Sequence, residues 1–312
     1  MKTVTLPQTD LCVPVLIAGM MRIRDLDDKA IRALVDAALA EGVTFFDHAD
    51  IYGGETHLCE RRFADALRLS TSQRDGMVLQ SKCGIVPSPR GTYYDFSHDH
   101  IIEAVEGSLR ALRTDYLDIL LLHRPDTLVE PDEVARAFDE LEAAGKVRHF
   151  GVSNHTPGQI ELLRSVVRSP LIVNQVQLSL THAPLVAQGL AANIAGEPQS
   201  VSRDVGLLDY ARLHGITLQA WSPFQNPGWT GTFLGNDANV GLNAALARLA
   251  TAYGVTPTGI ATAWLTRHPA AMQVVIGTTS PQHLRAAAAG VDVMLSRPEW
   301  YELFAAAGHA IP

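Results

Sequence analysis

Short apolar runs rich in β-branched and aromatic residues recur along the chain, separated by longer segments in which apolar positions follow a helical spacing. Eight of these runs predict strands, namely Val13–Gly19, Thr44–His48, Met77–Ser81, Leu117–Leu122, His149–Val152, Ile172–Gln177, Thr217–Trp221 and Gln273–Ile276. Regular alternation of strands with helices is typical of βαβ units and a parallel sheet. Several runs are apolar at every position, which suits strands covered on both faces.

Eight such units in 312 residues predict an α/β fold, a parallel eight-stranded (β/α)₈ or TIM barrel. Barrels of this size commonly form one domain, so we expect residues 1–312 to be a single domain. The helices carry their own boundary signals, in which a cap residue or proline begins the helix and a glycine ends it. The clearest helices are Asp28–Ala40 before Gly42, Asp132–Ala144 between Pro131 and Gly145, Pro157–Ser165 after Thr156, and an extra C-terminal helix capped by Ser296.

Three stretches rich in Gly, Pro, Ser or Asn break this pattern and predict loops, at Ile85–His98, Gly189–Ser202 and Phe224–Val240. The first and third follow strands three and seven, so they belong to the carboxyl face, where barrel enzymes keep their active sites. Their aromatic residues predict a pocket shaped by Tyr93, Tyr94, Phe96, Trp229 and Phe233. The second follows strand six as an insertion to which the sequence assigns no role.

Composition narrows the classes of protein. The chain is 47% hydrophobic and 19% charged, and 33 acidic against 25 basic residues give a net charge of −8. Without a dense basic run, nucleic acid is not an expected partner. No apolar stretch approaches the roughly 18 residues of a membrane helix, and the polar start Met1–Asp10 lacks a signal-peptide core, so we expect a cytoplasmic protein that does not enter a membrane. The three scattered cysteines, Cys12, Cys59 and Cys83, predict free thiols.

Polar residues stand where the predicted strands end. Asp47 and His48 end strand two and Asp50 follows it, Lys82 follows strand three, and His123 follows strand four. A buried Asp–Lys pair is often a structural ion pair, and a lone His is often a hydrogen-bonded structural residue. Because a barrel brings the carboxyl ends of its strands together, these side chains are expected to converge at one mouth. The same ring contains Ser153-Asn154, Asn174-Gln175 and Trp221-Ser222.

A metal site is the rival interpretation of this ring, because Asp47, His48, Asp50 and His123 could supply nitrogen and oxygen ligands. The ammonium of Lys82 would repel a divalent cation, and the histidines of this ring, His48 and His123, have neither an HxH nor an HExxH spacing. We therefore expect no metal.

Five motifs in order resemble the aldo-keto reductase family: Asp47-His48-Ala49-Asp50-Ile51-Tyr52-Gly53, Ser81-Lys82, Leu122-His123, Gly151-Val152-Ser153-Asn154 and Asn174-Gln175. The match spans nearly the whole chain. The run His123-Arg124-Pro125-Asp126 is similar to a bacterial oxidoreductase branch of that family.

The resemblance implies that an aldehyde or ketone is reduced by hydride from nicotinamide C4 and by a proton from Tyr52. A free tyrosine has a pKa of about 10, and a neighbouring ammonium such as Lys82 is expected to lower it towards the working pH. Asp47 would keep Lys82 charged and oriented. His123 would hydrogen-bond the substrate oxygen and align it for attack.

The resemblance also implies the cofactor contacts. Ser153, Asn154 and Gln175 resemble the groups that bond the carboxamide, and Trp221 resembles the residue that stacks on the nicotinamide ring. Around the ribose and pyrophosphate, the matching positions are Gly19, Met20, Asp47, Ser222, Phe224 and Asn226.

After strand eight, the run Gly277-Thr278-Thr279-Ser280 leads into a helix begun by Pro281, whose N-terminus is able to attract a phosphate. Relatives specific for NADP usually carry a cation where this chain has Ser280 or His283 and an acid–amide pair where it has Ala286-Ala287. This weakens the expected grip on a 2′-phosphate, although Arg285 or His283 could compensate. NADP(H) is the expected cofactor, with NAD(H) as the alternative.

The expected partner is a small-molecule carbonyl substrate, and the expected assembly is a monomer or weak homo-oligomer. Aromatic loop residues favour an apolar or aryl carbonyl. The other classes left open are a nicotinamide-binding barrel with a sensory or regulatory role, a metal-dependent barrel hydrolase or isomerase, and an interaction protein.

Overall fold

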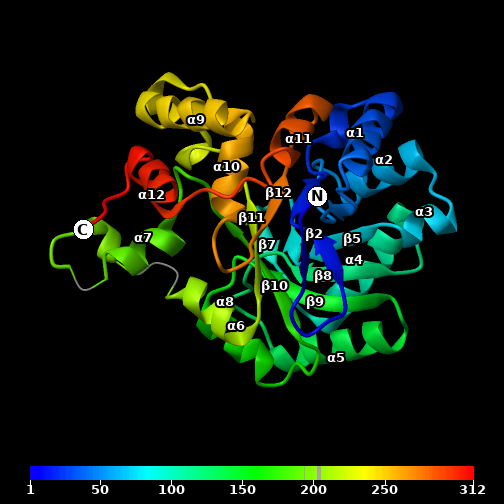
Figure 1. Cartoon of the computed structure of the whole chain (residues 1–312). Coiled ribbons are helices and arrows are strands. Elements are labelled where there is room, and N and C mark those ends of the chain that lie inside the picture. The colour runs from blue at the N-terminus through cyan, green and yellow to red at the C-terminus, as the bar shows by residue number, and fades with distance from the viewer. Residues whose placement is uncertain (193, 202–204) are drawn as a thin grey trace.

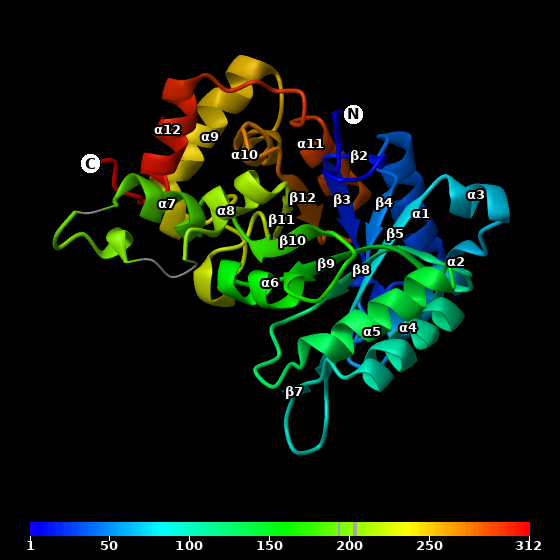
Figure 2. The same cartoon turned by 90° about the horizontal axis from the view of Figure 1, so that it is seen from below.

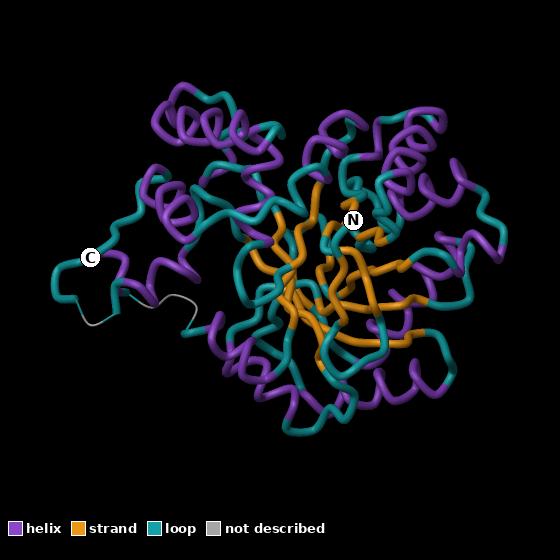
Figure 3. The backbone as a smooth tube through the Cα atoms, in the orientation of Figure 1, coloured by secondary structure: helices purple, strands orange, loops and turns teal. Residues whose placement is uncertain are grey.

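The eight barrel strands form one closed parallel sheet in the computed structural model, which describes residues 1–192, 194–201 and 205–312. Around the barrel the order is β10-β11-β12-β3-β4-β5-β8-β9. Helices surround the strands on the outside (Figures 1 and 3), which confirms the predicted (β/α)₈ barrel. The strands are β3 (Leu16–Gly19), β4 (Phe45–Asp47), β5 (Val78–Cys83), β8 (Leu117–Leu122), β9 (Val147–Ser153), β10 (Leu171–Gln177), β11 (Thr217–Trp221) and β12 (Gln273–Ile276).

The predicted first strand, Val13–Gly19, is wrong in its first half. Residues Cys12–Pro14 form β2, which pairs antiparallel with β1 (Thr3–Thr5), and the barrel strand begins only at Leu16. Pro14 has no N–H to donate to a neighbouring strand. Leu6 and Val13 of this N-terminal hairpin share a buried apolar cluster with barrel residues, including Ile17 and Phe45. The hairpin therefore packs against the barrel interior instead of extending a barrel strand.

The predicted helices and caps agree closely with the structure. Helix α1 (Asp28–Ala40) has the predicted bounds, and α5 (Pro131–Ala143) is shifted by one residue. Capping boxes begin α6 (Pro157–Arg164) at Thr156 and α12 (Arg297–Ala306) at Ser296. The remaining helices are α2 (Leu58–Leu67), α3 (Thr71–Asp75), α4 (His98–Leu112), α7 (Pro184–Leu190), α8 (Leu207–His214), α9 (Val240–Tyr253), α10 (Pro257–Thr266) and α11 (Pro281–Ala288).

The C-terminal helix packs beside the barrel rather than over its mouth. Trp300 and Phe304 of α12 stack near-parallel, with ring centroids 5.8 Å apart, and Trp300 stacks on Trp264 of α10 at 4.9 Å. The indole N–H of each tryptophan donates to the backbone carbonyl of the other, at 3.2 and 2.9 Å. These contacts bury the apolar face of α12 against α10.

The three predicted loops contain short regular segments. Residues Ile85–Val86 and Tyr93–Tyr94 pair as the antiparallel hairpin β6–β7, which projects from the barrel in Figure 2. The third loop contains a 3₁₀ turn at Pro227–Trp229 and another at Asp237–Asn239. Of the second loop, Asn193 and Ser202 lie outside the described residues, and Pro198–Ser200 forms a 3₁₀ turn. In the described part of the chain, no helix has the length and apolar character needed to cross a membrane.

Candidate active site

Polar side chains from six strand ends converge at the carboxyl mouth of the barrel, as the ring of strand-end residues predicted. Lys82 of β5 lies at the centre, and its ammonium donates to both oxygens of Asp47, each at 2.7 Å. It also donates to the His48 carbonyl at 2.7 Å and to the Tyr52 hydroxyl at 3.0 Å. Lys82 is only 1% exposed, so its charge is compensated entirely by these partners.

The pKa of Tyr52 does not follow the prediction. Burial raises it above the ordinary value of 10.0, and the nearby Lys82 ammonium lowers it by less than burial raises it. The net shift is therefore upward, which corrects the expectation that Lys82 brings Tyr52 towards the working pH. Desolvation disfavours the phenolate, so Tyr52 keeps its proton at neutral pH. That is the state a proton donor needs before it acts.

Lys82 is held in its charged form and His123 in its neutral form. Burial lowers the pKa of Lys82, but Asp47 and Tyr52 raise it more, so the net shift is upward and Lys82 is cationic. The pKa of His123 falls well below 6.5, first through burial and then through the charges of Lys82 and Arg124. Its ring stands edge-on to the Tyr52 ring at a centroid distance of 5.8 Å. A neutral imidazole beside the phenol can donate one hydrogen bond without adding charge.

Asp47 is anchored by two side-chain amides, that of Gln175 and that of Gln80, which the sequence did not single out. Gln80 donates to Asp47 Oδ1 at 2.6 Å and Gln175 donates to the same oxygen at 3.0 Å. Behind them, Gln219 links Gln80 and Gln175 to Gln273 through hydrogen bonds of 2.9 to 3.2 Å. These residues are buried. The available signal was a glutamine within each of four predicted strands.

The residues predicted to bond a carboxamide bond one another in this structure. Asn154 has a left-handed backbone (φ 62°) and donates to Ser153 Oγ at 2.8 Å. Its carbonyl oxygen accepts from the Trp221 indole at 3.0 Å. Ser153 Oγ in turn donates to the Gln175 carbonyl at 2.8 Å. The side chains of Ser153, Asn154 and Trp221 and the backbone carbonyl of Gln175 thus form one connected polar edge of the site.

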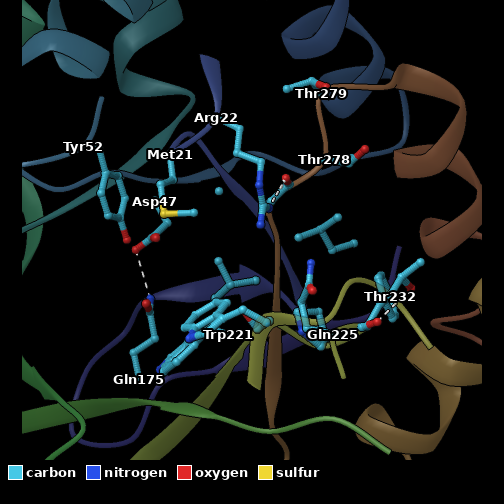
Figure 4. A pocket seen from close by; sticks show the side chains of 18 of the residues that line it. Met21, Arg22, Asp47, Tyr52, Gln175, Trp221, Gln225, Thr232, Thr278 and Thr279 are labelled. Atoms are coloured by element: carbon cyan, nitrogen blue, oxygen red, sulfur yellow. Dashed lines mark hydrogen bonds between the residues drawn. The ribbon is translucent and has the colours of Figure 1, made fainter. Parts of the chain in front are cut away.

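A cavity of about 610 Å³ opens over this edge. Figure 4 shows Tyr52, Asp47, Gln175 and Trp221 at one end, and Gln225 and Thr232 at the other. The candidate residues that line it are Gly19, Asp47, Tyr52, His123, Ser153, Asn154, Gln175, Trp221, Ser222, Phe224, Gly277, Thr278 and His283.

Four candidate residues lie behind the lining. Lys82 is buried beneath Tyr52, and Met20 is buried, with its N–H donating to the Asp47 carbonyl at 2.9 Å. Asn226 holds its own loop, donating to the Thr232 carbonyl and accepting from Asn239. Ser280 caps α11 by accepting from the His283 N–H. Each of the four therefore bonds to a lining residue without lining the cavity itself.

Arg22 is a lining residue that the sequence reasoning missed. It lies in the loop after β3, and its guanidinium donates to the Gly277 carbonyl at 2.7 Å. Figure 4 shows it reaching into the middle of the cavity towards Thr278. A Cβ at Gly277 would stand 2.6 Å from Arg22 Nη1, so the glycine makes room for the cation. In the sequence, the signal that could have identified Arg22 is its position just after the first strand, next to the Gly19-Met20 turn.

Comparison with known proteins identifies the family. A model of the aldo/keto reductase family matches residues 15–306. The chain belongs to this family. The 6-dehydroglucose reductase of Agrobacterium fabrum is 37% identical over 298 residues, covering 93% of this chain and 92% of the relative. Oxidoreductase YdhF of Escherichia coli is 35% identical over 304 residues, covering 95% and 94%.

A solved structure supports the fold of this aldo-keto reductase. The thermostable aldo-keto reductase Tm1743, in complex with the inhibitor epalrestat, matches with a TM-score of 0.75 at 24% identity, covering 98% of this chain and 100% of that one. With the family established, the chain is an NAD(P)H-dependent oxidoreductase that acts on carbonyl compounds.

Most of the aromatic residues expected to shape the reductase's pocket do not line the cavity. Among them, Trp229 alone is a lining residue of the described cavity, where it is 65% exposed and stacks on Trp221 at 5.9 Å. Phe96 and Phe233 are buried in the core. Tyr93 and Tyr94 lie exposed on the projecting hairpin. The loop aromatics failed as a guide because most of them pack their own loop or face solvent, as their spacing along the chain could not reveal.

Acidic and imidazole groups are also buried near Tyr52 in the reductase. Glu60 accepts from Ser81 and contacts His57 Nδ1, both at 2.6 Å, and these partners lower its pKa although burial alone raises it. Burial raises the pKa of Asp50 to about 8, and the charge of Glu60 adds to the rise. In the described residues, Asp50 Oδ1 and both ring nitrogens of His48 have no hydrogen-bond partner, and no three potential ligands gather as a metal site.

Asp50 makes the stability of the reductase depend on pH. The folded protein holds the Asp50 proton up to about pH 8, whereas the unfolded chain releases it near 3.8. Between these values the unfolded state binds fewer protons, so stability falls as pH rises, by about 1.4 kcal/mol per pH unit. We expect the free energy of unfolding of Asp50→Asn to exceed that of the wild type increasingly from pH 5 to 8. Urea denaturation checks this, with the exposed Asp10→Asn as control, and a gap that does not widen with pH contradicts it.

Proposed function

We propose that this enzyme reduces an aldehyde or ketone to the alcohol, with Tyr52 as the proton donor and a bound nicotinamide as the source of hydride. The observation that carries the proposal is the Tyr52 hydroxyl, which lies 3.0 Å from a buried Lys82 ammonium that is itself held on both oxygens of Asp47. Such an arrangement stabilises the phenolate that remains when Tyr52 gives up its proton.

The other residues position the reacting groups. His123, kept neutral by burial, donates a hydrogen bond to the carbonyl oxygen from the same side as Tyr52. Two donors on one oxygen orient the carbonyl and withdraw electron density from its carbon. Asp47 acts through Lys82 and does not touch the substrate oxygen.

The residues lining the cavity fit a dinucleotide. Trp221 offers a ring face for the nicotinamide. Ser153, Asn154 and Gln175 offer hydrogen-bonding groups to its carboxamide, after exchange of the bonds that their side chains make to neighbouring residues. Arg22 offers a charge for the pyrophosphate, together with the loop that contains Ser222 and Phe224. When bound, the reduced nicotinamide supplies a hydride to the carbonyl carbon.

The far end of the cavity favours only a modest preference for NADPH over NADH. It is lined by Thr258, Thr279 and His283, which provide hydrogen-bonding groups but no permanent cation. Arg285 faces Glu41 at 3.9 Å, so its charge is shared with a carboxylate just after α1. We propose that NADPH is accepted through His283 and the N-terminus of α11, with weak discrimination against NADH.

The cofactor proposal predicts two different responses. His283→Arg adds a permanent cation at the 2′-phosphate end, so we expect it to tighten NADPH roughly tenfold and leave NADH nearly unchanged. Arg22→Met removes a charge from the shared pyrophosphate, so both affinities fall by roughly 10–100-fold. Fluorescence titration of each variant with both dinucleotides measures this. An unchanged affinity ratio in His283→Arg would mean that the phosphate lies elsewhere.

A panel of carbonyl compounds tests the function itself. The purified enzyme is mixed with NADPH or NADH and each compound, and oxidation of the cofactor is followed by absorbance. Because the Agrobacterium relative is a 6-dehydroglucose reductase, the panel includes a sugar aldehyde beside aryl aldehydes, ketones and 2-oxo compounds. Cofactor binding without turnover of any carbonyl would replace this proposal with a regulatory nicotinamide-binding barrel.

A further inference from the structure

The residues that line the catalytic cavity carry more positive than negative charges. Its described lining residues include two arginines, Arg22 and Arg124, and one carboxylate, Asp47. Asp47 is committed to Lys82 beneath the floor. Arg22 is bonded to Gly277 and reaches towards Thr278, at a distance from Tyr52 along the cavity (Figure 4). Of the two lining arginines, Arg124 is therefore the one available to pair with a substrate at the Tyr52 end of the cavity.

Arg124 lies beside the reacting groups. It directly follows His123 in the chain, and its guanidinium carbon is 5.8 Å from the centre of the Trp221 ring. Its charge is close enough to contribute to the depressed pKa of His123. A group bound at Arg124 thus lies close to the carbonyl oxygen proposed to sit at Tyr52 and His123.

Arg124 has no protein counter-ion within the part of the chain that the structure describes, where it forms neither an ion pair nor a hydrogen bond. The nearest acid in sequence is Asp126, but its oxygens accept from the backbone N–H groups of Phe96 at 3.1 Å and Leu128 at 2.8 Å. The cost of partly burying a cation is recovered when an anion pairs with it.

The surroundings favour a small organic anion over a bulk ion. Met21, Trp221 and Trp229 provide apolar walls at this end of the cavity. A guanidinium presents parallel N–H groups that match the two oxygens of a carboxylate. A neutral hydroxyl would accept a hydrogen bond but leave the charge uncompensated.

We propose that Arg124 is a specificity-determining residue that selects carbonyl substrates bearing a carboxylate group. The carboxylate pairs with Arg124 while the carbonyl oxygen rests between Tyr52 and His123. This inference rests on the proposed reductase function and adds a substrate class to it.

A matched pair of aldehydes tests the inference. We compare 4-formylbenzoate with its methyl ester, at saturating NADPH, in the wild type and in Arg124→Gln. The wild type should prefer the acid, and Arg124→Gln should lower kcat/KM for the acid by roughly tenfold, mainly by raising KM. The ester lacks the charge, so its kcat/KM measures every other effect of the substitution. Arg90→Gln removes the same charge from the exposed β6–β7 hairpin and should keep the preference for the acid.

Binding of an unreactive ligand provides a second readout. Benzoate, and benzamide as its neutral counterpart, are titrated into the enzyme–NADPH complex by tryptophan fluorescence. Tighter binding of benzoate that is lost in Arg124→Gln supports the inference even if neither aldehyde turns over, a result that would count against the proposed function alone. An equal acid-to-ester ratio in wild type and variant overturns it. So does weaker NADPH binding with unchanged benzoate affinity, which would make Arg124 a cofactor residue.

Discussion

Tyr52→Phe is expected to lower kcat for carbonyl reduction by roughly 10²–10⁴-fold, the range typical of a lost general acid. The substitution removes one oxygen and leaves the ring in contact with His123. Lys82 keeps its three contacts with Asp47 and the His48 carbonyl, so the fold and the cofactor cradle are preserved. The dissociation constant for NADPH should therefore change little. Single-turnover measurements of aldehyde reduction, together with cofactor titration, check both expectations.

Tyr301→Phe on α12 is a matched control, because it removes the same hydroxyl away from the catalytic mouth. The pH profile gives an independent test of the role of Tyr52. Since burial raises the pKa of Tyr52 above 10.0, the wild-type rate of reduction should stay level from neutral pH to about 9 and decline only at more alkaline pH. Full activity in Tyr52→Phe would show that Tyr52 is not the proton donor.

Lys82→Met is expected to reduce stability as well as activity. The substitution leaves the Asp47 carboxylate buried without its cation, and removing one partner of a buried ion pair typically costs about 3–5 kcal/mol. Two glutamine amides remain on Asp47 Oδ1, which places the expected loss at the lower end of that range. Urea denaturation measures it.

A second substitution separates the effect on stability from the effect on chemistry. In Lys82→Met with Asp47→Asn, the unpaired charge is gone, so much of the lost stability should return. Turnover should not return, because the phenolate of Tyr52 still lacks its ammonium. If the double variant regains activity, Lys82 serves only to neutralise Asp47. If Lys82→Met alone is as stable as the wild type, the carboxylate takes up a proton or reaches solvent.

The barrel was predictable because its strands are buried on both faces and therefore appear as short apolar runs between capped helices. The same signal misled at Val13–Gly19, where one apolar run serves both β2 and β3. It also missed the β6–β7 hairpin, whose Tyr93–Tyr94 strand is two residues long and exposed. Short strands of this kind depend on their pairing partner, which a local pattern does not contain.

The ring of strand-end residues was predictable for a topological reason: parallel strands deliver their carboxyl-end residues to one face, so Asp47, Lys82 and His123 had to converge. Other features depend on three-dimensional detail. Gln80 and Gln219 reach Asp47 or its partners only because the barrel register turns them inward. Arg22 enters the cavity through the path of its loop. The upward pKa of Tyr52 reflects how completely it is desolvated, and a list of neighbours cannot supply that.

The amide chain beneath Asp47 also determines where protons can travel. Lys82 directs hydrogen bonds to Asp47, to a backbone carbonyl and to Tyr52, and Asp47 is bounded on its inner side by Gln80, Gln175 and Gln219. Side-chain amides hold their protons at neutral pH and do not transfer them. The amides beneath Asp47 therefore provide no path for protons through the interior of the barrel. In the proposed mechanism, Tyr52 would therefore regain its proton from the open cavity, along the route by which the alcohol departs.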